Sequence, residues 1–182
     1  DVCPFVPISE TTMDDCVNYS KILAEKVGKE LKIPIFLYEY SAATYERENL
    51  ADIRSGEFEG MADKMKSSGW KPDFGPAKPH NTAGVTAIGA RNFLIAYNIN
   101  LNTKDKKIAT DIALDIREKG RNKRNKNGKF VRDNNGVPIK VPGILKDCKA
   151  VGWYIDEYGL AQVSMNLTNF NETPPHAAFE ET

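Results

Sequence analysis

Two stretches, Phe93-Leu-Ile-Ala-Tyr-Asn-Ile-Asn-Leu101 and Ala161-Gln-Val-Ser-Met-Asn-Leu167, decide the fold of the second half of the chain. In both of them apolar side chains alternate with polar or small ones, which is the period of a half-buried β-strand. Each strand therefore has one face suited to a hydrophobic core. The opposite face of each strand is partly polar.

A helix and a hairpin are expected around these two strands. The spacing of Ile108, Ile112 and Ile116 predicts a helix between these two strands, with the three isoleucines as its buried apolar stripe. A strand over 150–155 should form a hairpin with the second quoted strand, and a last helix should begin near Pro174. The order β-α-β-β-α supplies five of the six elements of the split βαβ, or ferredoxin-like, unit.

The first half has a less regular pattern, with a long loop at its end. Its pattern of apolar residues predicts, in chain order, a strand over 2–8, a helix over 12–31 and a buried strand over 33–38. A polar, helical stretch over 42–66, broken at Ser55-Gly56, and a Pro- and Gly-rich loop over 69–84 are expected to follow. Long ordered loops in compact domains are often functional. The loop is therefore a candidate site.

Composition excludes several classes of protein. The chain has 182 residues, enough for one domain or two small ones, and its 25 basic and 25 acidic side chains leave no net charge. No apolar run approaches the roughly 18–20 residues that span a bilayer. Three widely spaced cysteines indicate neither a disulfide framework nor a zinc site. We expect a cytoplasmic protein with no membrane, nucleic-acid or metal partner.

Few residues are obvious candidates for chemistry. The two histidines, His80 and His176, stand alone in the sequence, which favours solvent-exposed or capping roles. Asn98, Asn100 and Asn166 lie on the polar faces of the two quoted strands. Carboxamides donate and accept hydrogen bonds, so they suit a heteroaromatic ring or an amino-acid substrate. The alternative is that this face of the sheet is simply wet.

A basic run from Arg117 to Arg132 is the sharpest charge feature, and it lies in a polar stretch, 121–146, that we expect to be a mobile excursion. It could bind a polyanion, either nucleic-acid phosphates or a polycarboxylate tail. Because no aromatic residue interrupts the run before Phe130, base stacking is unsupported. The alternative is a solvated insertion.

Several motifs resemble one known family, the formiminotransferase domain, in the same order over nearly the whole chain except the basic run. The motifs are Asp1-Val-Cys-Pro-Phe-Val-Pro7, Asp73-Phe-Gly-Pro76, Gly84-Val-Thr-Ala-Ile-Gly-Ala-Arg91, Phe93–Leu101, Gly152-Trp-Tyr154 and Ala161–Leu167. The resemblance implies a transferase that moves a formimino group from N-formimino-L-glutamate to tetrahydrofolate in histidine degradation. Its alternative is a non-catalytic folate- or small-molecule-binding module of the same family.

The resemblance also implies an architecture. The fold would be α+β, with two ferredoxin-like-type α/β sandwich subdomains around a folate cleft, both of them incomplete in this chain. Residues 1–92 would be the later part of the N-terminal subdomain, and residues 93–182 the earlier part of the C-terminal subdomain. A homodimer is implied as well. Tetrahydrofolate would be a co-substrate, with or without a polyglutamate tail that the basic run could attract.

Site residues follow from the same resemblance. The family's folate-binding loop corresponds to Gly75, Pro76, Ala77, Lys78, Pro79, His80, Asn81, Thr82, Ala83 and Gly84. The histidine that serves the family as general acid/base lies in a segment before Asp1. The resemblance therefore implies no catalytic residue within these 182. Asn98, Asn100 and Asn166 remain candidates for the substrate cleft.

Overall fold

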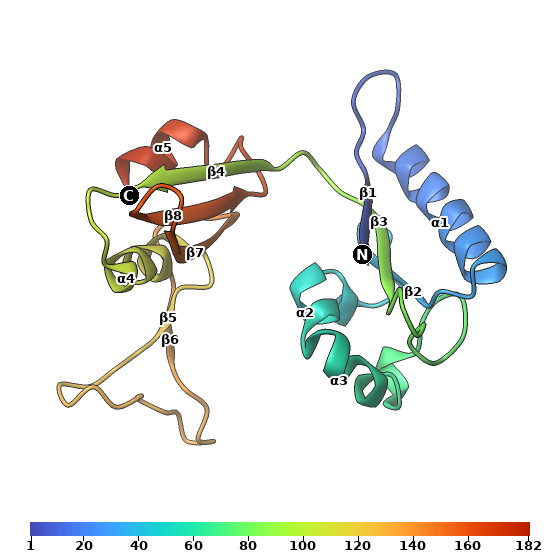
Figure 1. Ribbon diagram of the computed structural model, residues 1–182, viewed down its shortest axis with the longest axis horizontal. Helices are drawn as coiled ribbons and strands as arrows, with labels where there is room; N and C mark the ends of the chain where they lie inside the picture. The colour runs from blue at the N-terminus through green and yellow to red at the C-terminus, as the bar shows by residue number, and fades with distance from the viewer. The chain divides into compact units, whose positions relative to one another are not determined.

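The chain forms two compact α+β units, which confirms the expected fold class. The computed structural model describes residues 1–182 and divides into Asp1–Asn92, called unit 1 below, and Phe93–Thr182, called unit 2. Figure 1 shows that each unit has its own small sheet with helices packed against it. Each unit is built on three main strands.

Unit 2 has an antiparallel sheet in the order β4-β8-β7, formed by β4 (Ile95–Asn100), β7 (Cys148–Ile155) and β8 (Leu160–Leu167). Both neighbours of β8 pair with it in antiparallel register, so β4 and β7 run parallel with β8 between them. This is the split arrangement that the order of elements predicts. The expected alternation also holds, since the odd-numbered residues of β4 are half-buried and the even-numbered ones exposed.

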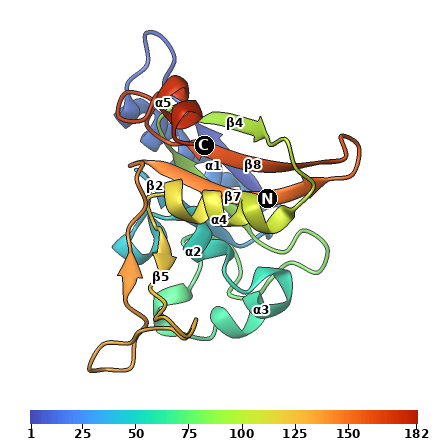
Figure 2. The same cartoon turned by 90° about the vertical axis from the view of Figure 1, so that its left-hand side faces the viewer.

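One face of this sheet is covered by α4 (Lys106–Ile116) and α5 (Pro175–Glu180), and Figure 2 shows α4 lying along the strands. The buried side of α4 is made of Ala109, Ala113 and Ile116. The predicted stripe was wrong at Ile108, which is 46% exposed. Small side chains face the sheet because α4 comes so close that a Cβ on Gly152 would lie 2.2 Å from the backbone nitrogen of Thr110.

Unit 1 has a parallel sheet in the order β1-β3-β2, formed by β1 (Val2–Phe5), β2 (Ile35–Glu39) and β3 (Thr86–Ala90). The strand order matches that of unit 2, but the inserted strand β3 runs parallel to its neighbours. The sequence pattern did not predict β3. Its residues, Thr-Ala-Ile-Gly-Ala, are too few and too small to show a clear alternation.

Helices cover both faces of the unit 1 sheet. The helix α1 (Met13–Glu30) packs on one side, and α2 (Leu50–Arg54) and α3 (Glu57–Lys64) pack on the other, as Figure 1 shows. Two short 3-10 helices, η1 (Tyr45–Arg47) and η2 (Ser68–Trp70), flank α2 and α3. A strand buried on both faces has no polar side. This explains why Ile35–Tyr38 is an uninterrupted apolar run.

Local sequence signals set the helix boundaries. Thr12 caps α1 in a capping box with Asp15, in which each residue's side chain bonds the other's backbone N–H. The expected break at Ser55-Gly56 is confirmed, because Gly56 adopts a φ of 90° between α2 and α3. The helical stretch over 42–66 is therefore several short helices.

We predict that Gly89→Ala destabilises unit 1. A Cβ at this position in β3 would lie 2.2 Å from the carbonyl oxygen of Tyr38 and 2.7 Å from its ring, so the backbones of two paired strands would have to separate. Overpacking of this kind costs about 2–3 kcal/mol. Gly60→Ala in α3, where a Cβ meets nothing within 4 Å, should instead stabilise by up to about 1 kcal/mol. Urea unfolding followed by circular dichroism measures both, and a loss at Gly60 as large as at Gly89 would contradict the explanation.

Candidate functional site

A buried ion pair fixes the start of the Pro- and Gly-rich loop. The Arg47 guanidinium lies 2.7 Å from a carboxylate oxygen of Asp73, and their side chains are only 8% and 12% exposed. The other carboxylate oxygen of Asp73 accepts a hydrogen bond from the backbone N–H of Leu37 in β2. Arg47 also donates to the carbonyl oxygen of Gly69. The pair thus joins both ends of the 69–73 segment to the sheet.

Backbone contacts continue this attachment into the predicted folate-binding loop. Ile35 donates to the carbonyl oxygen of Phe74, so the loop begins as an antiparallel partner of β2. Gly75 has a φ of 82°, and a Cβ there would lie 2.4 Å from the carbonyl oxygen of Ile33. A Cβ on Gly28 of α1 would lie 2.7 Å from the backbone nitrogen of Gly75. Only glycine fits at either position.

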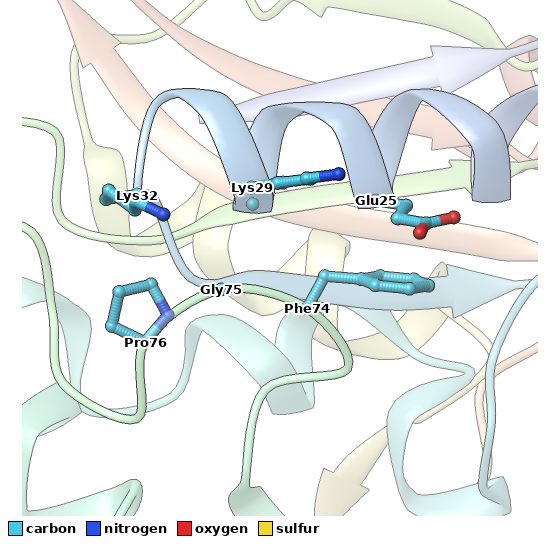
Figure 3. A pocket seen from close by; sticks show the side chains of 7 residues that line it. Glu25, Lys29, Lys32, Phe74, Gly75 and Pro76 are labelled. Carbon is cyan, nitrogen blue, oxygen red and sulfur yellow. The ribbon is translucent and has the colours of Figure 1, made fainter.

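An open hollow of about 270 Å³ lies where α1 meets the start of this loop. Figure 3 shows that α1 contributes Glu25 and Lys29, that Lys32 follows the end of this helix, and that the loop contributes Phe74, Gly75 and Pro76. All three charged side chains are exposed. The hollow is a shallow surface feature with an aromatic wall.

The tip of the loop is organised by His80. Its Nδ1 accepts hydrogen bonds from the backbone N–H groups of Thr82 and Ala83, at 3.3 and 3.1 Å. Its backbone exchanges two hydrogen bonds with Gly84, at 2.7 and 2.9 Å. Because Nδ1 accepts, the ring carries its proton on Nε2 when neutral. The side chain of His80 is therefore engaged in shaping the turn.

The ten predicted folate-binding residues differ in accessibility. Five of them are exposed and could reach a ligand directly: Gly75, Ala77, Lys78, Asn81 and Thr82. Four are half-buried and one is buried: Pro76, Pro79, His80, Ala83 and Gly84.

The polar face of the unit 2 sheet carries the other candidates. The strand register pairs Asn98 with Ser164 and places Asn166 opposite Ala96, so Asn98 and Asn166 are diagonal neighbours. Asn98, Asn100 and Asn166 are all exposed, on the face opposite α4 and α5. The sheet thus places the three predicted carboxamides on one surface.

Two further residues of this face were not predicted as site residues. Gln162 lies opposite Asn100 and donates a 2.8 Å hydrogen bond to its side-chain oxygen, and only 8% of Gln162 is exposed. Trp153, on β7, lies opposite Gln162 and is 49% exposed. An exposed tryptophan beside a row of amides offers a stacking surface for a flat ring. The alternation in the hairpin was the signal that could have identified both.

The buried Cys148 and Tyr38 lie outside both candidate surfaces and do not form a nucleophilic centre. Burial raises the pKa of the Cys148 thiol to about 11, so it carries almost no thiolate at neutral pH. Burial also raises the pKa of the Tyr38 hydroxyl, and the positive charge of the nearby Arg91 guanidinium offsets part of this increase. No group of three or more His, Cys, Asp or Glu side chains is placed to hold a metal ion. No helix has the length and apolar character needed to cross a membrane.

Comparison with known proteins shows the family to which the chain belongs. The family model described as the formiminotransferase domain, N-terminal subdomain, matches residues 1–91, and the model described as the formiminotransferase domain matches residues 96–182. The chain therefore belongs to the formiminotransferase domain family.

Curated relatives of the chain are named as formimidoyltransferases. A formimidoyltransferase-cyclodeaminase of Dictyostelium discoideum is 49% identical over 182 residues, which are 100% of this chain and 30% of the relative. Glutamate formimidoyltransferases of Streptococcus pyogenes serotype M1 and Thermoplasma acidophilum are 46% and 39% identical, over 99% of this chain and 53% and 52% of their own lengths. The chain thus spans about a third to a half of the curated relatives it matches.

We predict that Asp73→Asn destabilises unit 1 strongly. The substitution leaves the buried Arg47 without its counter-charge, and breaking a buried pair in this way costs about 3–5 kcal/mol. Asp63→Asn is the matched control, because the ion pair of Asp63 with Lys66 is fully exposed to solvent and its loss should leave the free energy of unfolding almost unchanged. Urea unfolding of both variants decides the matter, and equal losses would show that the Arg47–Asp73 pair does not anchor the loop.

A second prediction concerns the tip of the loop. His80→Ala removes the acceptor for two backbone N–H groups, so the amides of Thr82 and Ala83 should exchange with solvent about fivefold faster. His80→Asn places a carboxamide oxygen near the position of Nδ1 and should restore the slow exchange. Amide hydrogen exchange followed by NMR tests this. Fast exchange in His80→Asn as well would assign the effect to something other than the lost acceptor.

Proposed function

We propose that these residues form part of a glutamate formimidoyltransferase. Such an enzyme moves the formimino group of N-formimino-L-glutamate to N5 of tetrahydrofolate, giving 5-formimidoyltetrahydrofolate and L-glutamate. The observation that carries the proposal is the match of two successive formiminotransferase models over nearly the whole chain. The relatives named as glutamate formimidoyltransferases support it.

The organisation of the whole protein belongs to the same proposal. Residues 1–92 would be the later part of the N-terminal subdomain, and residues 93–182 the earlier part of the C-terminal subdomain. The full protein would act in the cytoplasm as a homodimer. Its folate would be accepted with or without a polyglutamate tail.

The candidate surfaces have chemistry that suits these substrates. The loop Gly75–Gly84 is held firmly at its start, and its exposed middle offers backbone groups and the Lys78 ammonium to a folate. Asn98, Asn100 and Asn166 can each donate and accept, as a pterin ring requires, and their NH₂ groups can donate to an amino-acid carboxylate. Preorganised polar groups of this kind orient a substrate at low entropic cost.

The proton transfers of the reaction need a further group. Attack of N5 on the amidine carbon forms a tetrahedral intermediate, so a general acid/base must move protons to and from nitrogen. Of the two histidines, His80 uses Nδ1 to hold its turn, and His176 lies exposed in the first turn of α5. We therefore propose that these residues bind and orient the substrates. The proton shuttle would come from another part of the enzyme.

A titration with 5-formyl-tetrahydrofolate, a stable analogue of the folate substrate, tests the binding role. Trp153 lies on the polar face of unit 2, so saturable binding at micromolar concentrations should change the tryptophan fluorescence. The double variant Asn98→Ala/Asn166→Ala should bind about tenfold more weakly, because it loses two hydrogen-bonding side chains.

Asn134→Ala is the matched control. This asparagine is also exposed in unit 2 but lies outside the sheet, so its loss should leave the affinity unchanged. A folded sample that shows no saturable change would contradict the proposed folate binding. Binding that survives in the double variant would exclude the polar sheet face as its location.

A further inference from the structure

Positive charge is concentrated in one segment of unit 2. Residues 117–140 contain nine Lys and Arg side chains and only two acidic ones, Glu118 and Asp133. Because the whole chain is neutral, the remaining residues carry sixteen basic and twenty-three acidic side chains. The segment projects from unit 2 beyond the two-stranded ribbon β5 (Arg121–Asn122) and β6 (Lys140–Val141), as Figure 1 shows. The segment is therefore strongly basic within a chain that is neutral as a whole.

The segment contains two tandem copies of an eight-residue unit. They are Arg124-Asn-Lys-Asn-Gly-Lys-Phe-Val131 and Arg132-Asp-Asn-Asn-Gly-Val-Pro-Ile139. Both copies have Arg first, Asn or Asp second, Asn-Gly at the fourth and fifth positions, and a β-branched residue last.

Both copies fold in the same way. In the first turn the Asn125 side-chain oxygen accepts from the backbone N–H groups two and four residues further on, and the Arg124 guanidinium donates to the carbonyl oxygen of Gly128 at 2.6 Å. In the second turn Asp133 accepts in the same pattern, and Arg132 donates to Gly136 at 2.5 Å. The repeated sequence thus encodes a repeated turn with a fixed arginine.

Three backbone hydrogen bonds close the two turns into a ring. Val131 donates to Lys123, Ile139 donates to Val131, and Lys123 donates to Ile139, at 2.9, 2.9 and 2.7 Å. We expected a mobile excursion here, but the structure contains a hydrogen-bonded module. Its base is pressed against the end of α4, since a Cβ on Gly143 would lie 2.0 Å from the carbonyl oxygen of Arg117.

A pocket of about 360 Å³ lies between the first turn and the last turns of α4. Its apolar lining comes from Leu114 and Phe130, and the Arg124 guanidinium lies 4.3 Å from the centre of the Phe130 ring. Five of the lining side chains are cationic: Arg117, Lys119, Arg121, Arg124 and Lys140.

Most of these cations have no carboxylate partner. Arg121 is neutralised by α4, through Asp111 at 3.4 Å and Asp115 at 2.6 Å. Arg117 and Arg124 donate only to the neutral carbonyl oxygens of Gly120 and Gly128. No carboxylate pairs with Lys119 or Lys140, both of which are exposed. The pocket therefore has an excess of positive charge with two of its guanidinium groups already held in position.

We propose that this pocket binds a small oligoanion, a ligand with several phosphate or carboxylate groups in series. Guanidinium groups donate to such groups in pairs, and ammonium groups add point charges around them. A single-stranded nucleic acid fits the pocket less well. The one aromatic ring that lines it, Phe130, is already covered by Arg124. Binding of a phosphate ligand here is independent of the proposed transferase activity, whereas binding of a γ-glutamyl chain would rest on it, because a polyglutamate tail belongs to the folate of that proposal.

Isothermal titration of the whole chain with tripolyphosphate tests the proposal. We expect one saturable site that weakens as salt rises, because the contacts are ionic. The double variant Lys119→Gln/Lys140→Gln should bind about tenfold more weakly. The matched control Lys126→Gln/Lys129→Gln removes the same charge from the same segment but from outside the pocket, and should change the affinity less than about twofold.

The second turn provides a control for the guanidinium. Arg124→Gln should weaken binding about tenfold, whereas Arg132→Gln, which removes the equivalent arginine from the turn that does not line the pocket, should have little effect. Circular dichroism checks that each variant folds, and the two lysine pairs decide the question should either arginine variant unfold. Equal weakening by the pocket and control variants would overturn the proposal, because it would indicate diffuse attraction. Absence of saturable binding would overturn it too.

Two further titrations separate the possible sources of the ligand. A preference for tripolyphosphate over a tetra-γ-glutamate peptide assigns the site to phosphates, and the reverse preference assigns it to carboxylates; either result supports an oligoanion pocket. Tight binding of a single-stranded RNA, weakened equally by both lysine pairs, would instead show that the segment acts as an extended polyanion surface and would overturn the proposal.

Discussion

The Arg47–Asp73 ion pair is the interaction on which the arrangement of unit 1 depends. One carboxylate oxygen of Asp73 accepts a hydrogen bond from Arg47 in η1, and the other accepts one from the backbone N–H of Leu37 in β2. The Asp73 side chain therefore joins η1, the edge strand β2 and the start of the loop. With both side chains almost fully buried, neither can lose its partner without leaving a charge out of water. The loop Gly75–Gly84 therefore leaves the sheet at a fixed point.

The two units share the same strand order but expose different surfaces to solvent. In unit 1 both faces of the sheet are covered, so its ligand-binding potential lies in the loop that follows the buried pair. In unit 2 both helices lie on one face, and the other face displays a row of carboxamides beside an exposed tryptophan. The excursion of unit 2 adds a cationic module that is independent of either surface.

The sequence predicted the elements whose pattern is complete within a few residues. The alternation in β4 and β8 and the capping signal at Thr12 were sufficient, because they reflect local periodicity and local hydrogen bonds. The strand β3 was missed because its position between β1 and β2 comes from long-range pairing. The stripe on α4 was misassigned at Ile108 because the closeness allowed by Gly152 selects alanines instead.

Prediction of the candidate site was limited in the same way. The polar face of unit 2 followed from alternation, but the burial of Gln162 and its bond to Asn100 depend on register. The role of His80 as an acceptor for its own turn could not be read from an isolated histidine. The ordered basic module was hidden because its stability comes from side-chain oxygens that accept from nearby backbone N–H groups, without any apolar periodicity.

Folate binding by these surfaces is tested most directly by an NMR map of 5-formyl-tetrahydrofolate binding on the whole chain. Ligand-dependent shifts should concentrate in the amides of residues 75–84 and in the side-chain amides of Asn98, Asn100 and Asn166. The basic module over 121–141 should stay unchanged with this mono-glutamate ligand. Shifts confined to other regions, or no shifts with a folded sample, would contradict the assignment of these surfaces to folate binding.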